Sequence, residues 1–157
     1  MALEFSAAAR KRFAEILSRY PKKEAALLPV LYLGQEEFGY LSGEAIEYVA
    51  KIMEIPTARV YSVVTFYTML NMKPVGRHHI QVCRTLPCAL CGAERITAFI
   101  KANLGIDVGQ TTSDGKYTLS EVECLASCGT GPMMQINDDY YESLTEEKVA
   151  EILRALK

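Results

Sequence analysis

Five cysteines constrain this chain of 157 residues more than any other feature, because they lie in only two short segments. The segments "VCRTLPCALCG" and "ECLASCG" hold the thiols of Cys83, Cys88, Cys91, Cys124 and Cys128. Structural disulfides are rare in a reducing cytoplasm, so this set of thiols indicates metal binding or redox chemistry. A fold for this chain must bring two separate loops together, or it leaves several thiols without a role.

The spacing of the cysteines fits several kinds of site. Cys83 and Cys88 form C-x4-C, and Cys124 and Cys128 form C-x3-C, so each pair could chelate one metal of a 2Fe-2S cluster with four thiolate ligands. Adding Cys91 to the first pair gives the C-x4-C-x2-C of plant-type ferredoxins, which would leave Cys128 unused. Those clusters sit in one long loop, however, whereas Cys91 here leads straight into a predicted helix. Cys88 and Cys91 also form the C-x-x-C of a thioredoxin-like dithiol.

Two further metal sites bear on the same residues. Zinc accepts four thiolates, and the spacing within the two cysteine pairs does not exclude it. A Rieske centre needs histidine ligands, and only His78 and His79, which precede the first cysteine, are present. Spacing alone favours a cluster on four of the five thiols, which are Cys83, Cys88, Cys124 and Cys128.

The hydrophobic pattern divides the chain into a helical first part and a mixed second part. Residues 1–73 carry apolar side chains at helical spacing in four short segments, which predicts a small helical bundle. Ser42 is the expected N-cap of the third segment, which should bury Ile46, Val49 and Met53. Pro74 and Gly76 then end the helical pattern.

Residues 74–157 have the pattern of an α/β domain of thioredoxin-like size. The run "HHIQV" predicts a strand, and "GAERITAFIKANLG" predicts a helix that ends at Gly105. Asp114 and Gly115 indicate a hairpin between strand-like flanks, and two further strands should turn near 137–139. Thr145 is the expected cap of a last helix. The fold class is therefore α+β, with an N-terminal helical bundle followed by an α/β domain.

Charge and motifs exclude several classes of function. A net charge of −2 offers no basic excess for nucleic acid. No apolar run approaches the length of a membrane span, and Glu4 and Glu15 interrupt what could be read as a transit peptide, so a cytoplasmic location is expected. Neither G-x-G-x-x-G nor a Walker A motif is present. We therefore expect no nucleotide or flavin site in the chain itself.

Two long segments resemble one known family. "LPVLYLGQEEFGYLSGEAIEYVAKIMEIPTARVYSVVTFYTMLNMKPVGRHHIQVC" is similar to the small 2Fe-2S, thioredoxin-like ferredoxin subunit of the NADH-oxidising module of respiratory complex I. "ECLASCGTGPMMQINDDYYESLT" is similar to the second cluster loop of the same family. The resemblance extends over essentially the whole chain, and the two cysteine loops and "TFYTM" match in order.

The resemblance implies a helical domain at 1–73 and a thioredoxin-like domain at 74–157 that carries one 2Fe-2S cluster. It implies the ligands Cys83, Cys88, Cys124 and Cys128, and it leaves Cys91 as the spare thiol. The implied function is electron transfer in NADH:quinone oxidoreductase, where the cluster exchanges single electrons with the flavin mononucleotide of a larger, NADH-oxidising partner subunit. Such a complex would hold the chain at the cytoplasmic side of the inner membrane without inserting it. NAD-linked hydrogenases and formate dehydrogenases contain the same type of subunit, which is the alternative parent complex.

Three further groups of side chains are interpreted without a role in the chemistry of the site. An apolar stretch could face a partner protein, but it is expected in the core of the bundle, and it consists of Val60, Val64, Tyr67 and the residues from Met69 to Met72. Arg77 and Arg84 flank the first cysteine segment and could stabilise the charge of a cluster or an acidic docking residue, but both are interpreted as solvated charges. The acidic residues of the C-terminal segment are interpreted as a solvated face, and these are Asp138, Asp139, Glu142, Glu146 and Glu147.

Overall fold

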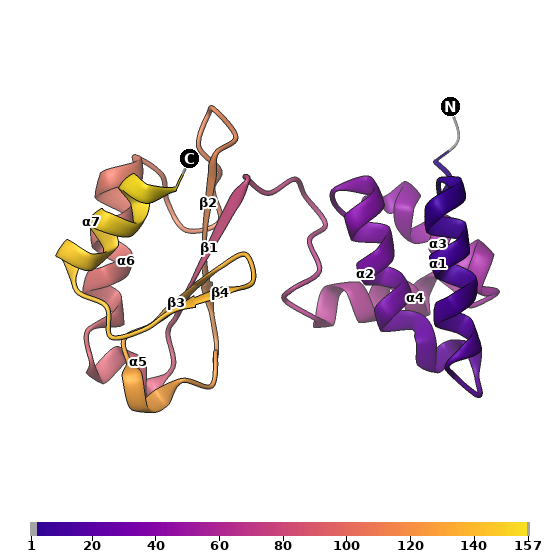
Figure 1. The fold of residues 1–157 in the computed structure, drawn as a ribbon, viewed down its shortest axis with the longest axis horizontal. Helices are drawn as coiled ribbons and strands as arrows, with labels where there is room; N and C mark the ends of the chain where they lie inside the picture. The colour runs from indigo at the N-terminus through magenta and orange to yellow at the C-terminus, as the bar shows by residue number, and fades with distance from the viewer. Residues whose placement is uncertain (1–2, 157) are drawn as a thin grey trace. The chain divides into compact units, whose positions relative to one another are not determined.

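The computed structural model describes residues 3–156, which form two compact units that divide between Pro74 and Val75 (Figure 1). We call residues 3–74 the helical unit and residues 75–156 the α/β unit. The predicted α+β class is confirmed. No helix in this described part of the chain is both long and apolar enough to cross a membrane.

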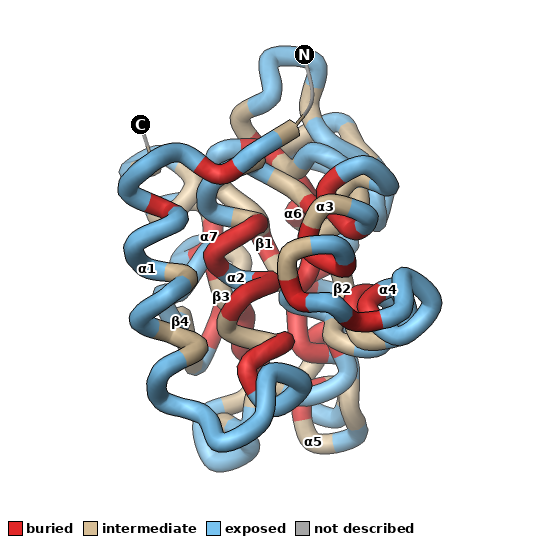
Figure 2. The backbone as a smooth tube through the Cα atoms, turned by 90° about the vertical axis from the view of Figure 1, so that its right-hand side faces the viewer, coloured by how far each residue is buried: buried red, intermediate tan, exposed pale blue. Residues whose placement is uncertain are grey.

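The helical unit consists of four α-helices and one short 3-10 turn, and its sequence pattern explains where they begin. The elements are α1 (Ala7–Ser18), η1 (Lys23–Ala26), α2 (Leu27–Phe38), α3 (Gly43–Met53) and α4 (Thr57–Phe66). The hydroxyl of Ser42 accepts a hydrogen bond from the N–H of Ala45 at 3.2 Å, as expected of an N-cap. The predicted apolar face of α3 is buried, and the most buried stretches of this unit lie on α2 and α3 (Figure 2).

The apolar stretch at 60–72 is only partly core. Val60, Val64 and Leu70 are buried in the bundle, as predicted. Met69 is 44% exposed, so the prediction is wrong for this residue. The difference arises because α4 ends at Phe66, and the residues that follow no longer keep helical spacing.

The α/β unit is a four-stranded sheet with helices between and after the strands. The elements are β1 (His78–Cys83), α5 (Leu86–Leu90), α6 (Ala93–Leu104), β2 (Tyr117–Val122), η2 (Cys128–Thr130), β3 (Met134–Ile136), β4 (Asp139–Tyr141) and α7 (Glu146–Ala155). The strand order is β2-β1-β3-β4. β1 runs parallel to β2 and antiparallel to β3, and β4 runs antiparallel to β3. Helices α6 and α7 lie side by side against the sheet (Figure 1).

The register of the sheet gathers four chain segments at one edge. Cys83 at the end of β1 pairs with Val122 at the end of β2. Met134, the first residue of β3, pairs with Val82 on one side and with Tyr141, the last residue of β4, on the other. The loops after β1, β2 and β4 and the loop before β3 therefore all meet at the same edge.

The predicted hairpin at Asp114 and Gly115 is present as a turn but not as two strands. The N–H of Gly115 donates to the carbonyl oxygen of Thr112 at 2.8 Å, and Gly115 has φ +68°. Before the turn, however, only an isolated bridge joins Thr111 to Thr118. The N–H of Gly109 donates to the carbonyl oxygen of Leu119 at 2.7 Å, so the flank before the turn follows β2 for only a few residues and forms no strand of its own.

Candidate metal centre

The two cysteine loops leave the sheet side by side. We call residues 83–91 the first cysteine loop and residues 124–128 the second. Because β1 and β2 are parallel and Cys83 pairs with Val122, the chain reaches Cys124 only two residues beyond the partner of Cys83. The carboxyl ends of adjacent parallel strands meet at one edge, where binding loops of α/β folds commonly lie. The sheet register thus brings together the two loops that the sequence analysis singled out.

Cys83 is buried, and its sulfur has hydrogen-bond partners from both cysteine segments. The Sγ atom lies 3.3 Å from Oγ1 of Thr85 and 3.8 Å from the carbonyl oxygen of Glu123. Burial works to raise the pKa of Cys83, but hydrogen bonds from Thr85 and from the N–H of Leu125 outweigh it and lower the pKa. Leu125 belongs to the second cysteine loop, so a backbone donor of that loop already contacts the sulfur of the first.

Cys88, on α5, is also buried, and its thiol is held in the protonated form. Burial raises the pKa of Cys88 to about 11, helped by a hydrogen bond to Cys83 and by electrostatic interaction with the sulfurs of Cys83 and Cys128. The N–H of Met133 acts in the opposite direction, because it donates to the sulfur. Cys83, Cys88 and Cys128 therefore lie within electrostatic range of one another, although they come from both cysteine loops.

Cys124 and Cys128 lie on the exposed side of the centre. The sulfur of Cys124 accepts a hydrogen bond from the N–H of Ala126 at 3.3 Å. Ala126 itself has φ +58°, a left-handed conformation that residues with a side chain rarely adopt. Cys128 opens the 3-10 turn η2, which leads to the cis Gly131–Pro132 peptide bond before β3.

The chemistry of the donor set fits an iron–sulfur cluster, whose iron ions take cysteine thiolates as ligands. Among residues 3–156, no three His, Cys, Asp or Glu side chains are gathered as a preformed site for one metal ion. A 2Fe-2S cluster does not require such a group, because each iron takes only two protein sulfurs. Backbone N–H groups from Leu125, Ala126 and Met133 already donate to cysteine sulfur, as expected around thiolate ligands. Loading would release the proton now held by Cys88, since iron binds thiolate.

Cys91 shares its exposure with Cys124 and Cys128 but belongs to the first cysteine loop. It follows the last residue of α5 and is exposed. A Cβ built on Gly131 would lie 3.5 Å from Sγ of Cys88 and 3.7 Å from the Cβ of Cys91, so both residues lie beside the segment that follows η2. The pKa of Cys88, by contrast, responds to Cys83 and Cys128.

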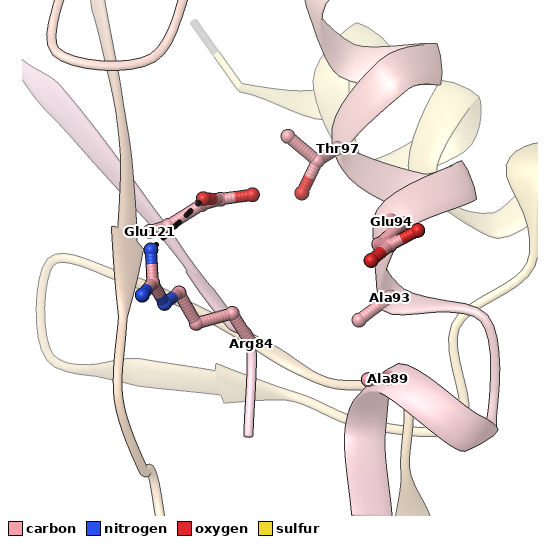
Figure 3. Close-up of a pocket in the computed structure, with 6 residues that line it drawn as sticks. All are labelled: Arg84, Ala89, Ala93, Glu94, Thr97 and Glu121. Carbon is pink, nitrogen blue, oxygen red and sulfur yellow. Dashed lines mark ion pairs between the residues drawn. The ribbon is translucent and has the colours of Figure 1, made fainter. Parts of the chain in front are cut away.

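Arg84 links the two cysteine loops, a role that the sequence analysis missed. Its guanidinium pairs with Glu121 at 3.8 Å and with Glu123 at 3.1 Å. Figure 3 shows the pair with Glu121 on one wall of a pocket of about 290 Å³, with Thr97 of α6 on the other. Arg84 follows Cys83 and Glu123 precedes Cys124, so one ion pair joins the neighbours of two candidate ligands. A lone arginine in the sequence gives no signal for this contact.

Glu142 is the second residue whose role the sequence analysis missed, because the acidic segment was interpreted as a solvated face. The hydroxyl of Thr130 donates to Oε1 of Glu142 at 2.7 Å, and the hydroxyl of Ser127 hydrogen-bonds to the same oxygen. The hydrogen bond from Ser127 and then that from Thr130 lower the pKa of Glu142. Only the sheet register, which places the end of β4 beside the second cysteine loop, could have indicated this contact.

The two histidines lie on β1 before Cys83. Nε2 of His79 is hydrogen-bonded to Oγ of Ser120 at 2.8 Å, and burial lowers the pKa of His79. The ring of His78 lies 5.6 Å from the ring of Tyr117. Both interactions are with β2, which agrees with a structural role for this pair.

Comparison with known proteins identifies the class to which this site belongs. Residues 13–157 match the family of thioredoxin-like 2Fe-2S ferredoxins, so the chain belongs to that family. The 2Fe-2S cluster predicted as its cofactor is therefore confirmed at the level of the family.

Individual relatives indicate a parent complex as well as a family, because they are subunits of NADH-quinone oxidoreductase. The chain is 50% identical to one such subunit from Rickettsia felis, a match covering 88% of this chain and 85% of the relative. It is 38% identical to another from Rhizobium meliloti, covering 94% of this chain and 88% of the relative. These relatives confirm the resemblance stated from the sequence.

A solved structure shares the fold. The NAD+-reducing NiFe-hydrogenase in its air-oxidised state superposes with a TM-score of 0.72 at 18% sequence identity. The match covers 83% of this chain but only 22% of the hydrogenase chain. At this identity the likeness concerns the fold alone.

Proposed function

We propose that this chain is the electron-transfer subunit of an NADH:quinone oxidoreductase and that it holds one 2Fe-2S cluster on Cys83, Cys88, Cys124 and Cys128. The observation that carries the ligand assignment is the parallel register of β1 and β2, which brings the two cysteine loops to one sheet edge. The relatives from Rickettsia felis and Rhizobium meliloti, both subunits of NADH-quinone oxidoreductase, support the parent complex.

When bound, the cluster takes up and gives back one electron at a time. The buried cysteines, the exposed cysteines and the backbone donors have different roles around the cluster. Cys83 and Cys88 are buried and anchor the site to the core of the α/β unit. Cys124 and Cys128 are exposed, which leaves a short path between the site and a partner at the surface. The N–H donors of Leu125 and Met133 stabilise negative charge on sulfur.

The proposal requires a partner, because NADH delivers a hydride and the cluster accepts only single electrons. We assign NADH oxidation and the splitting of the electron pair to a flavin mononucleotide-binding subunit, and we assign no nucleotide or flavin site to this chain. The parent complex would hold the chain at the cytoplasmic face of the inner membrane. An NAD-linked hydrogenase or formate dehydrogenase would use the same subunit chemistry, and it is the alternative parent.

A dithiol oxidoreductase using Cys88 and Cys91 is the competing function of a different class. An attacking cysteine needs a lowered pKa, because the thiolate is the nucleophile. Burial and the neighbouring cysteine sulfurs raise the pKa of Cys88 to about 11 instead, which argues against this chemistry.

The test is spectroscopic. Anaerobically purified full-length protein should be brown and should give an electron paramagnetic resonance signal after reduction with dithionite. NADH alone should not produce the signal, whereas NADH should produce it in the purified complex with the flavin-binding partner. Colourless protein that reduces insulin disulfides would support the dithiol function instead, and stoichiometric zinc in the native protein would also contradict the proposal.

A further inference from the structure

Glu142 lies at the same edge of the sheet as the cysteine loops. It follows Tyr141, which pairs with Met134, and Met134 pairs with Val82 next to Cys83. Asp138, in the turn between β3 and β4, lies at the opposite end of the same two short strands. The register therefore separates these two acidic residues, although they lie close together in sequence.

The carboxylate of Glu142 accepts hydrogen bonds from residues on both sides of Cys128. Ser127 precedes Cys128 in the chain, and Thr130 ends the turn that Cys128 opens. Both hydroxyls hydrogen-bond to the same carboxylate oxygen, and they also lie 2.7 Å from each other. One carboxylate oxygen thus joins the two ends of the segment 127–130, which contains Cys128.

The backbone holds Glu142 in this position. The N–H of Ser143 donates to the carbonyl oxygen of Thr130 at 2.7 Å, and the N–H of Leu144 donates to that of Pro132 at 3.0 Å. Nζ of Lys148 donates to the carbonyl oxygen of Glu142 at 2.6 Å. These bonds join the segment after β4 to the segment after Cys128, so the carboxylate is fixed rather than swinging in solvent.

We propose that Glu142 is a positioning residue of the metal centre, which fixes the loop of Cys128 through Ser127 and Thr130 and lowers the reduction potential of the cluster by its negative charge. This inference rests on the proposed function, because it concerns the same site. Reduction adds a negative charge to the cluster, and a fixed carboxylate one loop away opposes that charge. Lys148 compensates only in part, since its ammonium contacts the backbone carbonyl and not the carboxylate.

The size of the effect follows from the setting of the carboxylate. A charge near a protein surface, about 10 Å away at an effective dielectric constant of about 20, changes a one-electron equilibrium by roughly tenfold, and solvent screening reduces this. We expect about a three- to tenfold change in the reduction equilibrium. A tenfold change corresponds to about 59 mV for one electron.

The first experiment separates charge from contact. Glu142→Gln keeps an oxygen acceptor for both hydroxyls and removes the charge. Redox titration of the full-length, cluster-loaded variant should show wild-type iron content and a reduction equilibrium shifted about three- to tenfold toward the reduced form. Asp138→Asn removes the same charge at the far end of the strands and should shift the equilibrium less than twofold. Equal midpoints for the two variants would overturn the role of the charge.

The second experiment tests positioning without any metal. In Ser127→Ala/Thr130→Val, the carboxylate loses both hydroxyl donors. Alkylation of Cys128 in metal-free full-length protein, followed by mass spectrometry, should be at least about threefold faster than in the wild type, with Cys91 as the internal reference. An unchanged rate would overturn the positioning role, and this readout also decides the question if Glu142→Gln does not fold. Wild-type protein that binds no cluster would instead refute the proposed function, while the alkylation rates would still test the contact.

Discussion

Gly76 fixes the position of β1 against β2, and so it is a residue on which the whole site depends. Its N–H donates to Oγ1 of Thr118 at 2.6 Å, and the two residues after it continue the pairing through Gly115 and Lys116. A Cβ built at this position would lie 2.7 Å from the backbone carbon of Tyr117 and 2.9 Å from that of Lys116. We therefore predict that Gly76→Ala strongly destabilises the α/β unit.

The magnitude follows from what the methyl group would meet. The obstructing atoms are backbone atoms, which cannot rotate away as a flexible side chain would. Ordinary contacts require 3.4 Å or more, so the two chain segments must separate by about 0.5–1 Å. Overpacking of this kind costs about 1–3 kcal/mol, and loss of the hydrogen bond to Thr118 adds about 1 kcal/mol. We expect a loss of about 3 kcal/mol in the free energy of unfolding.

Urea unfolding followed by far-ultraviolet circular dichroism measures this change. Gly43→Ala is the matched control, because a Cβ at Gly43 would have no neighbour within 4 Å and the residue begins α3. The control should change the unfolding free energy by less than about 0.5 kcal/mol. If Gly76→Ala were as stable as this control, the close approach of the chain to β2 at Gly76 would be refuted.

Two further predictions concern the backbone and a titrating side chain. Ala126→Gly should raise the free energy of unfolding by about 0.5–1 kcal/mol, because glycine adopts the left-handed conformation of this position without strain. The control Ala102→Gly, in α6, should lower the free energy of unfolding by about 1 kcal/mol. Changes of the same sign in both variants would contradict the prediction. Burial lowers the pKa of His79 below its ordinary value of 6.5, so the unfolded chain binds the proton first as the pH falls. Stability should therefore decline as the pH falls below about 6.5, and His79→Gln should flatten this part of the pH profile in thermal unfolding; an unchanged slope would contradict the assignment.

Local signals in the sequence predict the elements that frame the site. Ser42 and Thr145 cap α3 and α7 as expected, and Gly105 ends α6 with φ +66°. These predictions succeed because a cap depends on the residue itself and on N–H groups only a few positions away. The turn between β3 and β4 is likewise local and lies where the sequence indicates.

Short and long-range features were not predicted. Helix α5 spans only Leu86–Leu90, which is too short for a periodic pattern, so the chain between Cys83 and Cys91 was interpreted as a loop. The contacts of Arg84 and Glu142 depend on the order and register of the strands, which no short motif encodes. Sequence therefore indicates the thiols and the strands that carry them, but the groups that hold the two loops together become visible only in the folded chain.

The most direct test of the account compares the electron paramagnetic resonance spectrum of dithionite-reduced Cys91→Ser protein with that of Cys128→Ser protein. If the cluster is held by the thiols at 83, 88, 124 and 128, the Cys91 variant should retain the wild-type spectrum and iron content. The Cys128 variant should lose the cluster or give an altered spectrum. An intact spectrum in the Cys128 variant together with a lost one in the Cys91 variant would contradict the proposed ligand set and favour the plant-type arrangement.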